Sequence, residues 1–302
     1  MKFAIVARRR WFFMLSGTIT VAGLIVLLIF GLNLGTDFKS GSQVQIVLNQ
    51  PYNAVAIRSM FEKHGFAVGP EGITAGGTNN EMAIVRLSYP LTNLQEGKLN
   101  TAIHATFPKA LVPPEYSTVD PIIAQEQSQT AVLAVLLASL GIVIYVAIRF
   151  EFRFAVAGIV ALMHDAFIVI SVFALLRIEV DLPFIAAVLT IVGYSINDTI
   201  VIFDRIRENV KGAKIKTFQE LEALVDHSLW QTMARSINTV LTVLFAAMSL
   251  FFFGGDPIHD FCFALLVGLI SGAYSSIFIA SPIWVTWRGR SLARGRDAAV
   301  KA

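Results

Sequence analysis

Long apolar runs alternate with polar segments along this chain, and six of the runs are long enough to cross a membrane. A membrane-crossing helix needs about 20 consecutive, mostly apolar residues. The six runs are Trp11–Leu32, Ala131–Ile148, Phe154–Leu176, Leu182–Phe203, Ile237–Phe253 and Phe261–Val285. The pattern therefore predicts an α-helical polytopic membrane protein with six transmembrane helices. The first run exceeds the roughly 7–15 apolar residues of a cleaved signal peptide, so we expect it to be a retained anchor.

Between the first two runs, the sequence takes on the mixed composition of a small soluble domain. Alternating polar and apolar residues predict strands at Ser42–Leu48, Gly65–Thr74, Met82–Leu87 and Glu115–Ile123. Helical spacing of apolar residues predicts helices at Pro51–His64 and Leu91–Phe107. The order strand–helix–strand–strand–helix–strand is that of an α+β ferredoxin-like domain.

The candidate buried residues of this domain lie on its two predicted helices. They are Val55, Met60 and Phe61 on the first helix, and Leu94, Leu99, Ile103 and Phe107 on the second. Its two histidines, at 64 and 104, have no neighbours of metal-ligand type, so we expect both to be exposed. The segment shows no paired carboxylates, metal-ligand cluster or phosphate-binding glycine loop. We therefore interpret the domain as a binding or mechanical module, not an enzyme, and expect no cofactor or metal.

Composition and charge support a membrane protein and give its orientation. Only 15% of the residues are charged, against roughly 25% in soluble domains, and the mean hydropathy is +0.67. The net charge of +3 gives no reason to expect nucleic-acid binding, and the single cysteine, Cys262, excludes an intrachain disulfide. Lys and Arg gather before the first run and after the second, fourth and sixth, whereas the short loops on the other side carry only Arg177. Because cytoplasmic loops are enriched in Lys and Arg, both termini are expected in the cytoplasm and the soluble domain outside, in a bacterial periplasm.

Several polar residues interrupt the apolar runs. Ionisable groups at membrane depth usually face a bundle interior or a water-filled cavity, so each is a candidate functional residue. Asp165 falls near the middle of the third run, where a structural hydrogen bond, with His164 as a possible neighbour, is the competing interpretation. Asp198 lies in the fourth run with Asn197 and Thr199 beside it. Desolvation would favour its neutral form and an approaching arginine its charged form, which is the basis of a protonation switch.

The fifth run is preceded by a further candidate, Arg235, one turn before it. Asn238, three residues later, extends the same helical face. The competing interpretation for Arg235 is that its side chain reaches to the cytoplasmic interface.

A stripe of small residues marks the sixth run. It consists of Ala264, Gly268, Gly272, Ser276 and Ala280, four residues apart. Such stripes let two helices approach closely, and the sequence leaves open whether the partner helix belongs to this chain or another.

At this point the motifs are recognisable, and over essentially its whole length the chain resembles the SecF family, the smaller membrane subunits of the SecD–SecF protein-export complex. The motifs that carry the resemblance are residues 35–38 (GTDF), 162–165 (LMHD), 194–209 (YSINDTIVIFDRIREN), 234–239 (ARSINT) and 253–255 (FGG), together with the stripe from Gly268 to Ser276. The family has a Gly-Gly pair after Asp37 and Phe38. In this chain Ser40 replaces the first glycine of the pair, and Gly41 is the second. The sequence therefore does not decide the backbone conformation of the turn at Gly35–Gly41.

The resemblance implies a fold of the resistance-nodulation-division superfamily and a partner, SecD, that completes a pseudo-symmetric twelve-helix unit. It implies that the proton motive force drives preprotein translocation across the inner membrane, with the SecYEG translocon, YajC, unfolded preprotein and membrane lipids as further partners. By the same resemblance Asp198 and Arg235 belong to the proton-conducting site, together with an aspartate of SecD. Asp165 is a third proton-coupling candidate because of its position at membrane depth.

We expect four parts: residues 1–34 as cytoplasmic N-terminus and first helix, 35–128 as the periplasmic domain, 129–287 as the other five helices, and 288–302 as a basic tail. Two alternatives to a translocase subunit remain. An exporter of lipids or small molecules built on the same fold usually carries two large external loops, and this chain has one. An intramembrane aspartyl protease using Asp165 and Asp198 needs a Gly-x-Gly-Asp motif, whereas residues 195–197 (SIN) precede Asp198.

Overall fold

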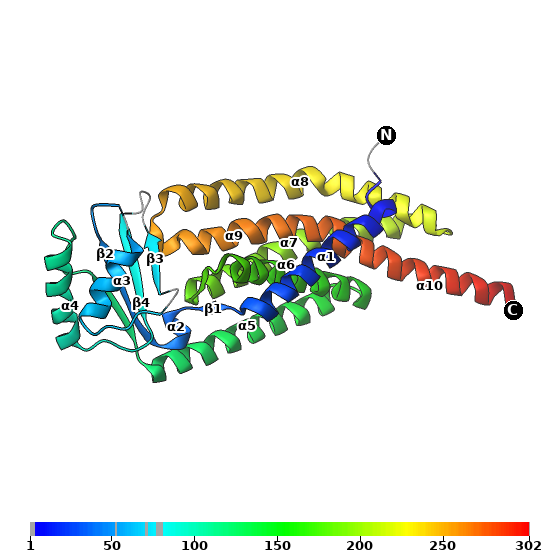
Figure 1. Ribbon diagram of the computed structural model, residues 1–302. Coiled ribbons are helices and arrows are strands. Elements are labelled where there is room, and N and C mark those ends of the chain that lie inside the picture. The colour runs from blue at the N-terminus through cyan, green and yellow to red at the C-terminus, as the bar shows by residue number, and fades with distance from the viewer. Residues whose placement is uncertain (1–3, 52, 70–71, 77–80, 302) are drawn as a thin grey trace.

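The structure, a computed structural model, describes residues 4–51, 53–69, 72–76 and 81–301, with the side chains of 256–257 and 292–301 excepted (Figure 1). Within these residues, six helices are long and apolar enough to cross a membrane, which confirms the six predicted spans. They are Val6–Phe30, Pro121–Arg149, Phe152–Leu176, Leu182–Gly212, Phe218–Phe253 and Ile258–Ser291.

The elements follow one another along the chain in three groups. The first group is η1 (Val6–Arg8), α1 (Arg9–Phe30), β1 (Asn33–Leu34) and α2 (Thr36–Lys39). The sheet domain contains β2 (Gly41–Val47), α3 (Ala54–Lys63), β3 (Ile73–Gly76), β4 (Met82–Leu87), α4 (Asn93–Thr106) and β5 (Glu115–Val119). The remaining elements are α5 (Pro121–Arg149), α6 (Phe152–Leu176), β6 (Glu179–Val180), α7 (Leu182–Gly212), α8 (Phe218–Phe253), α9 (Asp256–Ser275), η2 (Ser276–Ala280) and α10 (Ser281–Lys301).

The sheet domain has the ferredoxin-like arrangement that the sequence predicts. Its strands are ordered β3-β4-β2-β5, and every neighbouring pair is antiparallel. The helices begin at side-chain caps. Asn53 accepts hydrogen bonds from the amides of Val55 and Ala56 at the start of α3, and Thr92 and Gln95 form a capping box at the start of α4.

The core of this domain confirms most of the predicted buried residues and corrects two. Met60, Phe61, Leu99, Ile103 and Phe107 are buried, together with the alternating residues of β2. Val55 is 74% exposed and Leu94 82% exposed, so their predicted burial is wrong. Each is the second residue of its helix, in the first turn, and its side chain lies outside the buried face of that helix. The two histidines of the domain are exposed, as expected.

Two further differences concern element boundaries. β5 ends at Val119 and α5 begins at Pro121, because proline at the first helical position fits a helix start and not a strand interior. The weak strand expected before residue 74 lies at Ile73–Gly76 instead.

The turn after α2 keeps the backbone conformation of a Gly-Gly pair, although Ser40 stands at the first of the two positions. Gly41 has φ +130°, and a Cβ there would lie 2.2 Å from the Leu87 carbonyl oxygen, so only glycine fits. Ser40 has φ 63° and ψ 162°, a backbone region that is essentially restricted to glycine and costs other residues about 1–3 kcal/mol. The conformation of a glycine pair is thus kept, with Ser40 under strain.

Replacing Ser40 with glycine is therefore expected to stabilise the protein by about 1 kcal/mol, because glycine takes this backbone conformation without strain. A thermal melt of the purified chain should show a midpoint higher by roughly 2–4 °C. Ser88→Gly is the matched control, since Ser88 also lies in a turn of the sheet domain but without a positive φ. An unchanged or lowered midpoint for Ser40→Gly would show that Ser40 is not strained.

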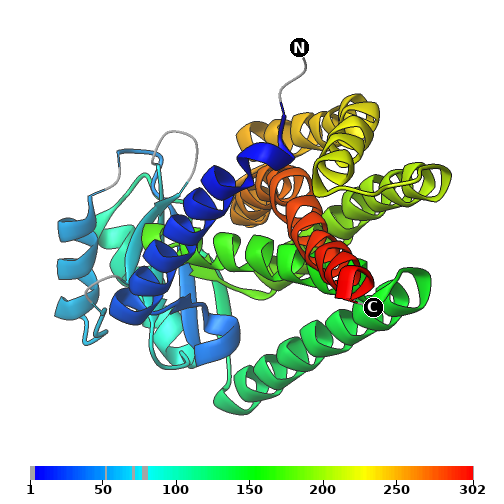
Figure 2. The same ribbon diagram turned by 90° about the vertical axis from the view of Figure 1, so that its right-hand side faces the viewer.

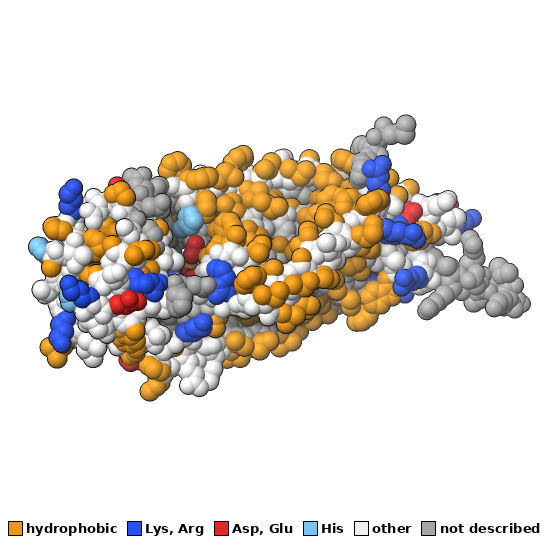
Figure 3. Space-filling model, viewed as in Figure 1, with side chains coloured by type: hydrophobic (Ala, Val, Ile, Leu, Met, Phe, Trp, Pro, Cys, Tyr) orange, Lys and Arg blue, Asp and Glu red, His pale blue; other side chains and the backbone are white. Residues whose placement is uncertain are grey.

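The spans form a bundle that carries the sheet domain at one end (Figure 1). The start of α1 and the end of α10 lie at the opposite end. α6, α7 and the sixth span are the most buried, whereas α1, α5 and α8 expose most of their length. Viewed along the bundle, α5 lies at its edge (Figure 2). On the face shown in Figure 3, apolar side chains cover the middle of the molecule, and most of the charged side chains lie towards its two ends.

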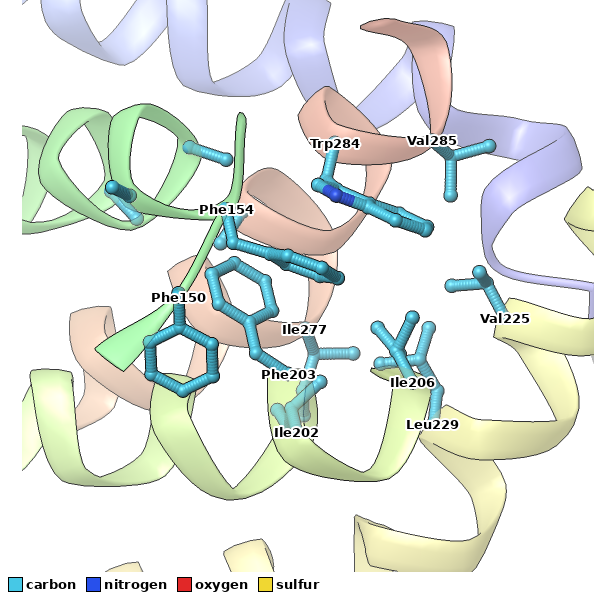
Figure 4. Packing of buried hydrophobic residues seen from close by; sticks show 14 of the residues in the cluster. Phe150, Phe154, Ile202, Phe203, Ile206, Val225, Leu229, Ile277, Trp284 and Val285 are labelled. Atoms are coloured by element: carbon cyan, nitrogen blue, oxygen red, sulfur yellow. The ribbon is translucent and has the colours of Figure 1, made fainter. Parts of the chain in front are cut away.

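Aromatic and aliphatic side chains of several spans pack together around Phe154 and Trp284 (Figure 4). The Trp284 and Phe154 rings stack with centroids 4.3 Å apart, and Phe203 packs on Phe154 at 4.9 Å. Ile277 and Val285 of the sixth span and Val225 and Leu229 of α8 join the same cluster. Because these residues come from four spans, this cluster fixes how α6, α7, α8 and the sixth span sit together.

Two spans differ from their predicted form. α8 begins at Phe218, well before the expected Ile237, because a capping box of Thr217 and Glu220 starts a helix in a stretch too polar to be recognised as a span. The sixth span changes from α-helix to a π-helical turn, η2. Helices also continue through two of the expected domain boundaries, α5 across 128/129 and α10 across 287/288, so the four-part division stays a prediction.

Candidate functional site

Asp165 lies at the centre of the bundle, fully buried and surrounded by hydroxyl groups. Ser195 of α7 donates to its Oδ2 at 2.7 Å, and Ser275 of α9 donates to the same oxygen at 2.6 Å. Ser271 donates to Oδ1 at 2.7 Å, and Nδ1 of His164 lies 3.2 Å from that oxygen. A buried carboxylate is costly unless its oxygens are hydrogen-bonded. These contacts satisfy both oxygens, and they join α6, α7 and α9 around one carboxyl group.

Asp198 is also buried but is much less well satisfied. Its Oδ2 is inaccessible to solvent and has no hydrogen-bond partner among the described residues. The hydroxyl of Ser236 on α8 lies beside the carboxylate and is itself buried without a hydrogen-bond partner. Asp198 lines a small cavity of about 20 Å³, together with Tyr194, Thr239 and Gly272. A space of that size holds about one water molecule.

Hydroxyl contacts link the surroundings of the two aspartates. Ser195 bonds Asp165 and also lines the cavity of Asp198, one helical turn away. The Thr199 and Ser276 hydroxyls lie 2.8 Å apart, and Ser276 is the first residue of η2. Polar contacts therefore run from the third span through the fourth into the π-helical turn of the sixth.

Arg235 does not join the aspartates within this chain. Its side chain is exposed on α8, and among the described residues none forms an ion pair or hydrogen bond with it. Asn197 and Asn238 are exposed as well. Thr239, one turn after Arg235, lines the cavity of Asp198. The candidate residues thus divide into two groups. Asp165, Asp198 and Thr199 are buried, whereas Arg235, Asn197 and Asn238 are exposed.

Arg235 and Asp198 nevertheless lie at similar depth in the bundle. Asp198 follows Leu182, where α7 begins, by about 24 Å at 1.5 Å per residue, and Arg235 precedes the end of α8 at Phe253 by about 27 Å. Both ends lie near the sheet domain (Figure 1). Among the residues that the structure describes, none neutralises Arg235 at this depth.

The small-residue stripe packs against a helix of this same chain. A Cβ on Gly268 would come within 2.3 Å of the Ile191 side chain, and one on Gly272 within 3.2 Å of Ser195. The stripe therefore lets α9 approach α7, which places Ser271 and Ser275 within reach of Asp165.

The motif at Gly35–Gly41 connects the sheet domain to the loop between the third and fourth spans. β1 pairs in parallel with β6, Asn33 with Glu179 and Leu34 with Val180. Asp37 accepts a hydrogen bond from the Leu182 amide at 3.1 Å. A Cβ at Gly35 would lie 2.7 Å from the Glu179 carboxylate. This loop is thus held by the chain segment that leads into the sheet domain.

Charged groups reinforce the connection. Glu179 forms an ion pair with Arg86 of β4, and Phe38 packs against the bundle cluster that contains Val180. Burial raises the pKa of Glu179 above its ordinary value, although Arg86 opposes the rise. Burial also raises the pKa of Asp181, which caps α7, to about 6, with neighbouring acids adding to the effect. The Asp181 carboxylate therefore takes up a proton as the pH falls through its pKa of about 6.

Three serines around Asp165 were missed or left without a role by the sequence reasoning. Ser195 stands inside a recognised motif, but nothing in its position distinguished it from other small residues. Ser271 and Ser275 are four residues apart on one helical face, a spacing that could have paired them with an aspartate. Within the described residues no group of three or more His, Cys, Asp or Glu is placed to hold a metal ion.

Comparison with known proteins identifies the relatives of this chain. Residues 98–290 match the family described as "Protein export membrane protein SecD/SecF, C-terminal", and residues 25–51 match the SecD/SecF GG motif. The protein translocase subunit SecF of Alicyclobacillus acidocaldarius is 58% identical over 99% of this chain and 98% of its own length. The SecDF of Bacillus subtilis is 43% identical over 96% of this chain, which corresponds to 39% of that longer protein.

Solved structures agree with these relatives. The crystal structure of SecDF from Thermus thermophilus matches 95% of this chain with a TM-score of 0.87 and 35% identity, over 39% of its own length. A SecDF structure titled the super-membrane-facing form matches the whole chain with a TM-score of 0.71 and 34% identity.

Proposed function

Since this chain belongs to the SecD/SecF family of protein-export membrane proteins, with SecD as its partner, we propose that the two subunits couple the proton motive force to preprotein movement. The chain is a multi-pass membrane protein with a role in protein export. The proposal places it in the bacterial inner membrane, where it promotes translocation through the SecYEG translocon, with YajC as a further partner. It acts as a coupling subunit and not as an enzyme.

One observation carries the proposal: a buried, incompletely satisfied carboxylate lies beside the helix that carries an unpaired arginine at the same depth. A charged side chain facing lipid is costly, so Arg235 needs a protein partner. In our proposal SecD covers this face and supplies an acid. Arg235, Asp198 and the SecD acid then form one site between the subunits, to which Asn197 and Asn238 contribute polar contacts.

The proposed cycle uses the change of charge at this site. Protonation of an acid removes its attraction to Arg235, so the helices that carry the two groups rearrange. Asp165 transmits the change, because Ser195 contacts both its carboxylate and the cavity of Asp198. A membrane potential supplies about 2.3 kcal/mol per charge per 100 mV, which biases a two-state equilibrium by well over tenfold.

The same route supports a mechanical output. Asp181 caps the start of α7, and β6 beside it pairs with β1 at the entrance to the sheet domain. A shift of α7 would therefore move Gly35–Gly41 and the domain that follows. We propose that this domain lies in the periplasm, where it contacts unfolded preprotein, and that both termini lie in the cytoplasm. The Lys and Arg bias of the short loops supports this orientation.

Copurification tests the partnership on which the shared site depends. A tagged copy of this chain, solubilised in mild detergent, should retain SecD, and Arg235→Met should retain it equally. If Arg235 acts in coupling and not in assembly, the variant loses function without losing its partner. A wild-type chain that purifies without SecD, or a variant that releases it, would contradict the shared site.

A further inference from the structure

A cleft opens at the end of the bundle remote from the sheet domain. Its volume is about 530 Å³, and it lies where the start of α1, the start of α8 and α10 meet. The residues that matter here are Arg9, Arg10, Phe13, Phe218, Gly289 and Arg290. Three arginines and two phenylalanine rings thus share one opening, which combines positive charge with an apolar wall.

The floor of the cleft is tightly built. A Cβ on Gly289 would lie 2.2 Å from the Phe218 ring, so the backbone of α10 rests directly on that ring. The Arg9 guanidinium lies 5.1 Å from the centre of the same ring, and it forms an ion pair with Glu222. Phe218 and Arg9 are therefore held in place by contacts within the chain.

The other two arginines are uncompensated. The side chains of Arg10 and Arg290 are exposed, and in the described part of the chain neither has an ion pair or a hydrogen bond. The nearby acids are engaged elsewhere: Glu222 pairs with Arg9, and Asp226 accepts from the amides of Ile5 and Val6. Two like charges facing one cleft repel each other unless an anion lies between them.

The position of the cleft indicates the kind of anion. Trp11, 72% exposed, follows Arg10 directly, and the exposed Trp287 precedes Arg290 on α10. Exposed tryptophans collect at the level of the lipid headgroups. Lys and Arg side chains gather at the same end of the apolar surface (Figure 3). Below the cleft, Met14 and Leu15 of α1 expose apolar surface of the kind that acyl chains cover.

We propose that this cleft binds an anionic phospholipid, with the headgroup phosphate between Arg10 and Arg290. Guanidinium groups bind phosphate by paired, charge-assisted hydrogen bonds, and basic pockets between transmembrane helices take up such headgroups. The acyl chains follow Phe13 and the exposed side of α1. The proposal depends on the chain lying in a membrane, not on the proton site.

Native mass spectrometry of the full chain in detergent tests the proposal, with dioleoyl phosphatidylglycerol as the probe. Each basic side chain near an anionic surface contributes about a fivefold factor in affinity. Arg10→Gln and Arg290→Gln should each weaken phosphatidylglycerol binding about fivefold, and the double variant about twenty-five-fold. The single variants keep the test valid if the double variant does not fold.

The control variant is Lys211→Gln/Lys214→Gln, which removes the same charge from exposed positions outside the cleft. It should keep wild-type affinity, and dioleoyl phosphatidylcholine should bind the wild type far more weakly. Inorganic phosphate at millimolar concentration should not displace the lipid. Equal losses in the control and the arginine variants would overturn the proposal, as would equal binding of the two lipids. Displacement by inorganic phosphate would show a site for free anions instead.

Discussion

Replacing Asp198 with asparagine is expected to abolish the stimulation of preprotein export by the proton motive force, while export driven by ATP alone continues. Asparagine keeps the shape of the side chain but cannot take up or release a proton, so the proposed charge switch is lost. Arg235→Met should have the same effect, because it removes the charge that responds to the switch. Inner-membrane vesicles that contain SecD and the translocon, compared with and without an imposed proton gradient, provide the measurement.

The same helix supplies a matched control. Asp204 lies two turns after Asp198, half exposed, and its carboxylate pairs with Arg149 at 2.9 Å. Asp204→Asn makes the identical chemical change outside the cavity, at a surface ion pair worth little. Stimulation should remain at the wild-type level. If Asp198→Asn keeps full stimulation, or if Asp204→Asn loses it equally, Asp198 is not the switch.

Gly268→Val is expected to give the largest loss of stability, about 3 kcal/mol. Its Cβ would overlap the Ile191 side chain, where close packing forbids added atoms. The displaced α9 would also draw Ser271 and Ser275 away from Asp165 and leave a buried carboxylate with fewer donors. The midpoint of thermal unfolding in detergent should fall by about 6–12 °C.

A second substitution separates overlap from a general intolerance of this helix. Ile191→Ala makes space for the added side chain, so the double variant Gly268→Val/Ile191→Ala should recover at least half of the lost stability. Gly141→Val on α5 is the control, because a Cβ there meets nothing within 4 Å. Equal losses for Gly141→Val and Gly268→Val would show that the α7–α9 contact has no special part.

The sequence predicts the fold well because the two dominant signals are local. Six runs of apolar residues are recognisable from length and composition, and β2 and β4 show the alternation of strands buried on one side. β1 and β6 escaped prediction because a two-residue pairing between segments more than 140 positions apart has no local pattern. The early start of α8 was missed for a different reason: Thr217 and Glu220 signal a helix start, not a span.

The sequence predicts which residues belong to the candidate site, but not which of them lie together in the fold. Asp165, Asp198 and Arg235 stand out because charge is rare at membrane depth. That Asp165 would be enclosed by serines, whereas Asp198 keeps a free oxygen, depends on how α9 meets α7. One residue in the sequence, Pro282, indicates the π-helical turn that begins at Ser276. Pro282 follows it and cannot donate a backbone hydrogen bond, so the regular ladder of the helix has to change there.

The cavity beside Asp198 has a consequence for a subunit that has not yet found its partner. Transfer of protons across a bilayer needs a continuous file of water molecules or exchangeable groups. The cavity beside Asp198 holds about one water molecule, which is too few to form such a file by itself. Under the proposed function, this cavity alone would not carry protons across the membrane in a copy without SecD. A continuous path would then form only when SecD is bound, so overproduction of this chain by itself should leave the proton gradient intact.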